Sequence, residues 1–523
     1  MTTARTRTRN RTVVAVPVAP PSTKSAGAGP VWAIALLLLL GVAYVGLFLS
    51  AVVSADMDLL HGLAVAPILF GLTIPIALRI ARTDRDPTLA TIILAGAATK
   101  ILMGYVQFKI GYGYFKGRVD AKQYDEAGRV LAPQFRQLDF NINIGKLVGT
   151  GYTKVLTGLV YSVAGAGRVA GYMVFAWIGF LGIVLLARAF HIGVPNGASR
   201  RYLILLLFLP SLLYWTSSIG KEAPMLLGIG LAAYGIASVM RSRSQGIFPL
   251  AGGTLVILLI RPHIALILFG AFAFALLVRR APARTYAAPM FRLIGIVTLI
   301  VLAFFLLSKT SAFLESNLKT SSLSDQLSET QERTTEAGSA FRPATVNTPI
   351  DLPWATVTVL IRPFIFEASG LPGLIAAAEG AFLLALFVLS WNRLRSVPKM
   401  FRNTPYVAFS IAYVVAFIVA FSRFANFGLL SRQRVQVTPF LLVLVALPTL
   451  RELTGAAAER AAEKRRAARK KKTSVPRLPA GPVVPSGTRR RLRPPAATSA
   501  SAADRTVVST GSQFSPPGRS SAP

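Results

Sequence analysis

Long apolar runs recur along this chain from residue 31 to about residue 450, and many of them are about 17 to 24 residues long. A helix of about 20 apolar residues crosses the bilayer core, and lipid requires each backbone polar group to be paired within the protein. The chain is 53% hydrophobic and 15% charged, against about 25% charged residues in a soluble domain. We therefore predict an all-α polytopic membrane protein with roughly twelve transmembrane helices. The predicted spans lie near residues 31–53, 61–82, 89–112, 168–190, 201–217, 223–240, 246–260, 264–279, 290–307, 372–392, 405–422 and 433–449.

The placement of basic residues gives this fold an orientation. The net charge is +36, but no basic soluble domain is present that would bind nucleic acid. Arginine and lysine instead collect in alternate loops and at both ends of the chain, as they do on the cytoplasmic side of membrane proteins. We therefore predict that both termini are cytoplasmic. The basic loop residues are Arg79, Arg82, Arg85, Arg188, Arg200, Arg201, Arg241, Arg243, Arg279, Arg280, Arg284, Arg393, Arg395, Lys399 and Arg402.

The chain divides into three parts. Residues 1–30 form a basic cytoplasmic tail that we expect to be disordered, and residues 31–450 form the transmembrane domain. A basic lead followed by an apolar run also describes a signal peptide, but the run of about 22 residues favours an uncleaved first span. Residues 451–523 form a second basic and largely disordered cytoplasmic tail, which we expect to contact anionic lipid. Two longer segments, 113–167 and 308–371, are predicted outside the cell.

Several kinds of site are excluded or disfavoured by composition. The chain has no cysteine, so disulfides, thiol catalysis and thiolate metal sites are excluded. It has three histidines, His61, His191 and His263, whose spacing does not resemble that of metal ligands. The sequence does not identify whether a cofactor is needed.

The first polar motif lies in the outer segment 113–167 and runs from Asp120 to Arg129. If this stretch is helical, Asp120 and Tyr124 share a face, because they are four residues apart. A carboxylate beside an aromatic hydroxyl is suited to binding a sugar hydroxyl and taking its proton. Asp120 and Tyr124 are therefore candidates for binding a sugar or taking a proton from it. The alternative is an ordinary helix start, in which Asp120 is the N-cap and the other charges are solvated.

The second motif joins two predicted spans and contains Trp215, Lys221 and Glu222. Trp215 is a candidate sugar-binding residue or a member of the aromatic belt at the membrane surface. Lys221 lies on the predicted outer side, where the charge rule disfavours basic residues. Glu222 is a second candidate for substrate binding, and helix capping is its alternative role.

Further cations are predicted on the same outer face. Arg261-Pro262-His263 lies between two apolar runs, and Arg432-Gln-Arg434 precedes the last span. We expect a re-entrant or interfacial helix near 352–366, which Arg362 interrupts and Glu367 follows. A single interfacial arginine usually extends toward lipid phosphate. Several such cations on one face, however, indicate a shared anion, and arginine is suited to bidentate phosphate contacts. The candidate phosphate-binding residues are Lys221, Arg261, Arg362, Arg423, Arg432 and Arg434.

Lys100 lies in the middle of a predicted span. An ionisable group at that depth is costly, so it should be paired or functional. Glu379, which also lies within an apolar run, is a candidate partner.

Taken together, these motifs resemble those of bacterial polytopic glycan-assembly proteins, namely the GT-C glycosyltransferases and the exopolysaccharide or O-antigen polymerases. The resemblance is carried by Asp-x-x-x-Tyr at Asp120, by the Pro-Ser to Lys-Glu stretch ending at Glu222, by Arg-Pro-His at Arg261 and by Arg-x-Arg at Arg432. It implies that Asp120 is the catalytic base, with Asp125 as a substitute. It also implies contacts to lipid phosphate for Lys221, Arg261, His263, Arg432 and Arg434. It also implies a location in the bacterial cytoplasmic membrane.

The expected function is therefore glycosyl transfer or glycan polymerisation on the outer face, with a polyprenyl-phosphate-linked sugar as donor. The absence of a recognisable sugar-nucleotide domain fits a lipid-linked donor. A transporter or flippase of a lipid-linked glycan or another anionic substrate is the alternative, because it also needs phosphate-binding cations. A non-catalytic membrane scaffold would leave the outer cations unexplained.

Overall fold

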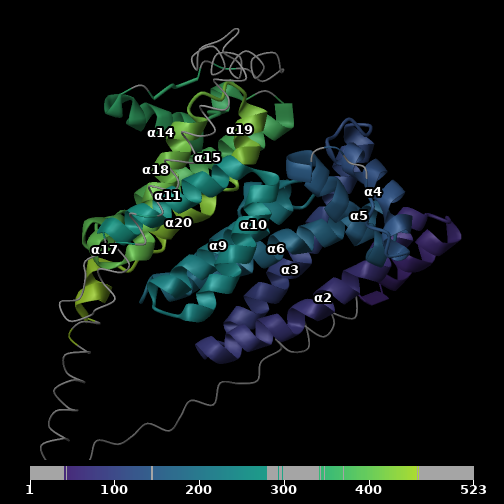
Figure 1. The fold of residues 1–523 in the computed structure, drawn as a ribbon, viewed down its shortest axis with the longest axis horizontal. Helices are drawn as coiled ribbons and strands as arrows, with labels where there is room; N and C mark the ends of the chain where they lie inside the picture. Colours follow the sequence, from purple (N-terminus) through teal and green to yellow (C-terminus); the bar gives the residue numbers. More distant parts are fainter. Residues whose placement is uncertain are drawn as a thin grey trace, which may run out of the picture. The chain divides into compact units, whose positions relative to one another are not determined.

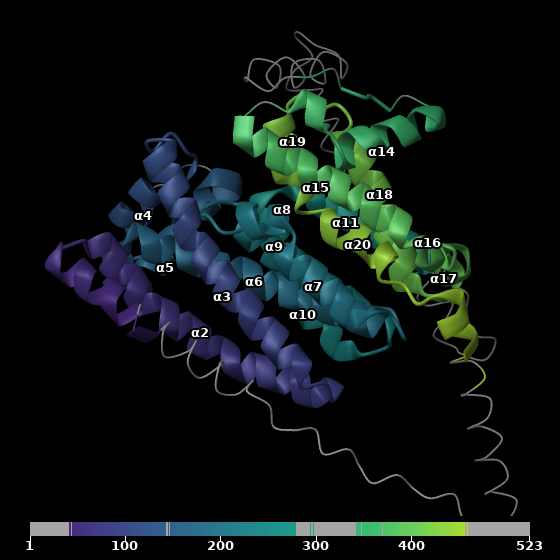
Figure 2. The same ribbon diagram turned by 180° about the vertical axis from the view of Figure 1, so that it is seen from behind.

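The computed structural model describes residues 41–278, except 43, 143, 144 and 146, and residues 341–455, except 342, 347 and 369, together with 293, 297 and 458. The regular elements of this part are helices, with no strand, so the all-α prediction is confirmed (Figures 1 and 2). The helices are α2 (Met57–Asp84), α3 (Thr88–Phe108), η1 (Lys109–Tyr114), α4 (Ala121–Arg136), η2 (Leu147–Gly151), α5 (Tyr152–Ala164), α6 (Arg168–Gly193), α7 (Ser199–Phe208), α8 (Pro210–Trp215), α9 (Glu222–Met240), η3 (Ser244–Gly246), α10 (Ile247–Ile260), α11 (Pro262–Val278), η4 (Pro349–Asp351), α14 (Leu352–Leu360), η5 (Ile365–Glu367), α15 (Gly370–Leu389), α16 (Trp391–Leu394), α17 (Val397–Asn403), α18 (Pro405–Phe421), α19 (Phe427–Arg434) and α20 (Thr438–Val445).

Several of these helices fit a membrane-embedded protein. Five are long and apolar enough to cross a bilayer, and a sixth is obtained if α17 and α18, bent by 109°, form one span. The five are Met57–Asp84, Thr88–Tyr114, Arg168–Gly193, Glu222–Met240 and Pro372–Leu389.

The twelve predicted spans are not matched one for one by these helices. Most of the predicted span 290–307 and part of 31–53 lie outside the described residues, as do the tail 1–30, most of the tail 451–523 and most of the segment 308–371. Other predicted spans form shorter apolar helices, such as Ser244–Ile260 and Pro262–Val278. The predicted span 201–217 is divided into α7 and α8, because Leu209 has an extended backbone and Pro210 starts a new helix.

Two glycines allow α6 and α9 to pack at close range. A Cβ atom added to Gly230 on α9 would lie 2.4 Å from the carbonyl oxygen of Gly182 on α6, so backbone meets backbone there. Small residues permit this approach between helices in lipid. In both ribbon views α6 runs beside α9 and α3, which form the packed centre of this part of the fold (Figures 1 and 2).

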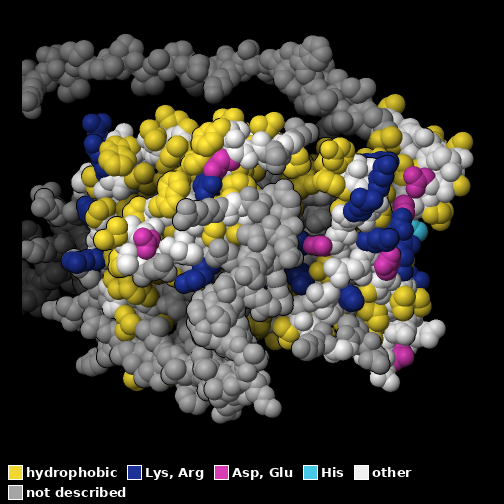
Figure 3. Space-filling model, turned by 90° about the horizontal axis from the view of Figure 1, so that it is seen from above, with side chains coloured by type: hydrophobic (Ala, Val, Ile, Leu, Met, Phe, Trp, Pro, Cys, Tyr) yellow, Lys and Arg dark blue, Asp and Glu magenta, His cyan; other side chains and the backbone are white. Residues whose placement is uncertain are grey.

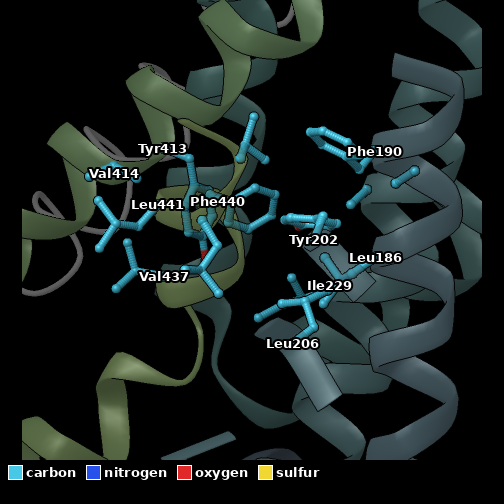
Figure 4. Close-up of a cluster of buried hydrophobic side chains, with 14 of the residues drawn as sticks. Leu186, Phe190, Tyr202, Leu206, Ile229, Tyr413, Val414, Val437, Phe440 and Leu441 are labelled. Atoms are coloured by element: carbon cyan, nitrogen blue, oxygen red, sulfur yellow. The ribbon is translucent and has the colours of Figure 1, made fainter. Parts of the chain in front are cut away.

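A buried apolar core joins this centre to the later helices. Phe190 of α6 stacks on Tyr202 of α7, with 4.4 Å between ring centroids, and Tyr413 of α18 packs on Phe440 of α20 at 4.3 Å. The Tyr202 hydroxyl donates to the carbonyl of Pro439, which links α7 to α20. Figure 4 shows these side chains converging from the two groups of helices. The early and late parts of the described chain therefore share one core.

Most of the segment 113–167, which was predicted outside the cell, folds into two helices, α4 and α5, that pack against each other. Tyr124, Gly128, Leu131 and Phe135 recur at helical spacing on the buried face of α4. The backbone of Gly128 lies close to Thr157 of α5. This pair places the first residues of α4 beside the start of α9, where the polar residues gather.

Candidate functional site

Glu222 is the centre of a buried group of charges. Its carboxylate accepts one hydrogen bond from Arg261 Nη2 and one from Arg432 Nη2, both at 2.9 Å, and it forms an ion pair with Arg432 Nε at 2.6 Å. Arg432 also forms an ion pair with Asp120. We call Asp120, Thr150, Lys221, Glu222, Arg261 and Arg432 the Glu222 cluster.

Four separate segments supply the charges of this cluster. Glu222 is the first residue of α9, where a carboxylate interacts favourably with the helix dipole. Arg261 lies at the break between α10 and α11, and Arg432 lies in the last turn of α19. Asp120 directly precedes α4, but its side chain makes no capping hydrogen bond. The N-cap role considered for Asp120 is therefore not what the structure shows.

Lys221 lies on the side of the cluster formed by the loop before α5. Its Nζ donates to the Thr150 hydroxyl at 3.0 Å. Gly149 has φ +84°, a backbone conformation that residues with a side chain rarely adopt. A Cβ atom added to Gly149 would lie 4.0 Å from Lys221 Nζ and from the Ile260 carbonyl oxygen. Burial, followed by the positive charge of Arg261, lowers the pKa of Lys221 below its ordinary value. Among the described contacts, Lys221 forms no ion pair with a carboxylate.

Tyr124 closes the same side of the cluster. Its ring is buried, and its hydroxyl is hydrogen-bonded to Thr150. Burial, followed by the negative charge of Glu222, raises the pKa of Tyr124. The hydroxyl therefore stays protonated at neutral pH and is available as a hydrogen-bond partner.

The Glu222 cluster carries more positive than negative charge. Arg261 and Arg432 pair with the carboxylates of Asp120 and Glu222, and Lys221, which donates to Thr150, is a third cation beside them. Arg261 Nη1 is buried and has no hydrogen-bond partner. The Asp120 side chain is 59% exposed, whereas Glu222 is 2% exposed. An excess cation and an unused buried donor fit a bound anion, because an unpaired donor of this kind costs free energy. Figure 3 shows basic side chains directly beside acidic ones on one face of the molecule.

Asp125 belongs to a different group, which we call the Asp125 network and which comprises Asp58, Asp125, Arg129, Tyr161 and Arg168. The Asp125 carboxylate is 1% exposed and accepts from Arg129 Nε at 3.0 Å, Tyr161 Oη at 2.7 Å and Arg168 Nε at 2.9 Å. Asp58 contacts both arginines and accepts from the backbone N–H of Arg168 at 2.7 Å. Burial and the charge of Asp125 raise the pKa of Tyr161. Asp125 is thus committed to holding α4 against α5 and α6.

Two more of the predicted phosphate-binding arginines are used to hold α14 in place. Arg434 is buried and donates to the carbonyls of Val359, at 2.6 Å, and Arg362, so it satisfies the C-terminal end of α14. Arg362 pairs with Glu367, whose pKa is lowered by this hydrogen bond. The Arg362 guanidinium also lies over the Phe341 ring at 4.8 Å. The predicted set of cations therefore divides, and three of its members meet at Glu222.

Trp215 and His263 are placed elsewhere. Trp215 is half-buried and meets Tyr214 edge to face, with 5.1 Å between centroids. His263 is exposed, and its ring faces Phe421 at 6.2 Å. Among the described contacts, neither side chain forms a hydrogen bond or ion pair with the Glu222 cluster.

The two charges inside apolar runs lie at opposite ends of the short helix α8. Lys100 Nζ donates to the carbonyls of Leu212 and Leu213 at the end of α8, and Glu379 accepts from the backbone N–H of Ser211 at its start, at 2.6 Å. An anion at the start of a helix and a cation at its end both match the helix dipole. The two groups therefore stabilise one helix from its two ends. They do not pair with each other, so the candidate pair of Lys100 and Glu379 is not formed.

Several polar residues of these groups were not predicted from the sequence. Thr150, Asp58, Tyr161 and Arg168 find their partners through long-range packing, which local patterns do not report. The Gly-Thr-Gly stretch around Thr150 is the one local signal that could have been used, because it marks a tight backbone turn before α5. Within the described residues, no group of three or more His, Asp or Glu is arranged to hold a metal ion.

Comparison with protein-family models, with curated proteins and with solved structures gave no match to this chain.

Proposed function

We propose that this chain is a glycosyltransferase or glycan polymerase of the bacterial cytoplasmic membrane, which acts on the outer face and uses a polyprenyl-phosphate-linked sugar as donor. In this proposal the chain crosses the membrane roughly twelve times and keeps both termini in the cytoplasm. The observation that carries the proposal is the Glu222 cluster. There an exposed carboxylate, Asp120, lies beside cations whose positive charge exceeds the negative charge around them.

Each group has a role in the transfer. Asp120 takes the proton of the acceptor hydroxyl as its oxygen bonds to the anomeric carbon of the sugar. The bond between that carbon and the phosphate oxygen breaks, and its electron pair leaves with the lipid phosphate. Lys221 and Arg261 stabilise the charge on this departing phosphate. Glu222 is a positioning residue, because its buried carboxylate holds Arg261 and Arg432 in place.

The test compares lipid-linked saccharides by mass spectrometry in a deletion strain that carries the wild-type gene, Asp120→Asn or Glu126→Gln. Glu126 is the matched control, since it is an exposed acid on α4 that pairs with Lys122. We expect Asp120→Asn to insert normally and to accumulate an unconsumed polyprenyl-linked sugar, while Glu126→Gln behaves as wild type. Identical pools in the deletion strain and the wild type would reject the glycan proposal.

A transporter or flippase of a lipid-linked glycan is the second candidate, and the break between α7 and α8 favours it. Helices interrupted within the membrane and flanked by charges are typical of transporter binding sites. The two candidates differ in where the lipid-linked glycan accumulates. Loss of a flippase leaves it in the inner leaflet, whereas loss of an outer-face transferase leaves it in the outer leaflet, so enzymatic probing of intact spheroplasts separates them.

A further inference from the structure

Lys100 is surrounded by oxygen atoms from the end of α8 and the residues that follow it. Its Nζ lies 2.8 Å from the Leu212 carbonyl oxygen, 3.0 Å from that of Leu213 and 2.9 Å from Ser217 Oγ, and it also donates to Thr216 Oγ1. We call these four oxygens the α8 oxygen cage. An ammonium group has three hydrogens, so four acceptors exceed what it needs.

The two hydroxyl groups of the cage are oriented by α8 itself. Thr216 Oγ1 donates to the Leu212 carbonyl and Ser217 Oγ donates to the Leu213 carbonyl, both at 2.6 Å. Each hydroxyl hydrogen is therefore used within the cage wall, and the hydroxyl lone pairs remain for Lys100. The cage presents oxygen lone pairs to its centre whether or not a lysine is there.

The cage also lies where a cation is needed. Lys100, Thr216 and Ser217 are completely buried, as is Leu212, whose carbonyl lies at the end of α8. The C-terminal end of a helix carries partial negative charge, and carbonyls at the end of a broken membrane helix are typical ligands of alkali cations.

We propose that the α8 oxygen cage is a binding site for a monovalent cation, and that the ammonium of Lys100 occupies it as a covalently attached cation. The four oxygens carry no formal charge, which favours a monovalent over a divalent ion. Three of the four lie 2.8 to 3.0 Å from Nζ, beyond the roughly 2.0–2.6 Å typical of Mg²⁺ and Ca²⁺, while Thr216 Oγ1 lies closer, at 2.5 Å. The ligand class is therefore a large monovalent cation, such as potassium or a primary ammonium ion.

The bound cation fixes the polypeptide that leads into the Glu222 cluster. The carbonyl of Thr216 faces Gly179 of α6, where an added Cβ would lie 2.7 Å from it. Gln107 donates to the Tyr214 carbonyl at 3.0 Å, which secures the same end of α8. Five residues after Thr216 the chain reaches Lys221. This inference does not depend on the proposed glycosyl transfer, because any function of that cluster would need the segment held in place.

The experiment removes the attached cation and supplies a free one. Lys100→Ala empties the cage, whereas Lys100→Met keeps most of the apolar stem without the charge. The melting temperature of the full-length protein in detergent is measured in potassium, methylammonium or choline chloride at matched ionic strength. We expect both variants to melt below the wild type in choline. Potassium or methylammonium should then raise the melting temperature of Lys100→Ala saturably, with little effect on the wild type or on Lys100→Met.

The proposal is overturned if Lys100→Ala responds equally to all three salts, or if Lys100→Met and the wild type show the same cation-specific rise. Should Lys100→Ala fail to fold, Thr216→Val and Ser217→Ala in the presence of Lys100 provide the second test. The two changes together are expected to lower the melting temperature, because they leave the ammonium two oxygen acceptors for its three hydrogens. Unchanged melting of the double variant would also overturn the proposal.

Discussion

The Asp125 network and the Glu222 cluster both bind the start of α4 to other helices, yet they differ in charge. The Asp125 network contains two carboxylates and two guanidinium groups, and the buried carboxylate of Asp125 is engaged by three donors. The Glu222 cluster contains three cations and two carboxylates, and it leaves Arg261 Nη1 without a partner. The charges of the first group balance, whereas the second group carries one excess positive charge and an unpaired buried donor.

The two aspartates near the start of α4 differ in the same way as the two groups. Asp120 and Asp125 are five residues apart, which places them roughly 140° apart around the helix. Asp125 faces α5 and α6 and is buried, while Asp120 faces outward with 59% of its side chain exposed. The same residue type is therefore buried in a network at one position and exposed at the other.

The largest effect on stability is expected for Glu222→Gln. This change leaves Arg261, which is 12% exposed, and Arg432, which is 20% exposed, without a buried counter-charge. Breaking a buried ion pair on one side costs about 3–5 kcal/mol. The free energy of unfolding, measured by equilibrium denaturation in mixed micelles, should fall by that amount. The exposed Glu126→Gln provides the control, and equal stability of the two variants would show that Glu222 does not hold the arginines.

A smaller loss is expected for Asp125→Asn. Arg129 and Arg168 are both more than a third exposed, so water replaces part of what the carboxylate provides. The cost is then that of unsatisfied hydrogen bonds, about 1–3 kcal/mol. The same denaturation assay measures it, and the double variant Asp125→Asn with Arg168→Gln should lose less than the sum of the single variants, because the two residues form one network. Additive losses would contradict the view that Asp125 and Arg168 belong to one network.

The fold could be predicted from the sequence further than the site could. The apolar runs predict helices such as α6 and α9, because the requirement to pair backbone groups in lipid acts locally. The break at Leu209 was missed, since the residues on both sides of it are apolar and hydropathy does not register a change of backbone direction. The position of Arg-Pro-His between two apolar runs, in contrast, predicted the break between α10 and α11.

In the site, the choice of residues was more predictable than their pairing. Lys221, Arg261 and Arg432 were selected because they oppose the charge rule, and the structure brings them together at Glu222. Arg434 was selected for the same reason, but it binds backbone carbonyls at the end of α14. Such partners carry no sequence signature. The Asp120–Arg432 pair spans 312 residues, so only the packed fold determines it.

Asp120→Asn is expected to have little effect on stability. Its carboxylate is largely exposed, and pairs of this kind contribute about 0–1 kcal/mol. Loss of the proposed transfer with unchanged unfolding would separate Asp120 from Asp125, which should lose stability. If instead Asp120→Asn is the less stable of the two, the functional contrast between the two aspartates is wrong.

The smallest effect concerns pH and Lys221. Its pKa in the folded protein is lowered by burial and by Arg261, whereas the unfolded chain has the ordinary lysine value of 10.5. Between these two values the unfolded state binds more protons than the folded state, so the free energy of unfolding should rise with pH across that alkaline window. Lys221→Met should remove this contribution, and Lys122→Met, on the exposed side of α4, should retain it.

A bound anion would compensate the positive charge of the cluster and stabilise protonated Lys221, so inorganic pyrophosphate should flatten the slope of the wild type. If pyrophosphate leaves the slope unchanged while Lys221→Met removes it, Lys221 is partly buried next to Arg261 but does not contact the anion.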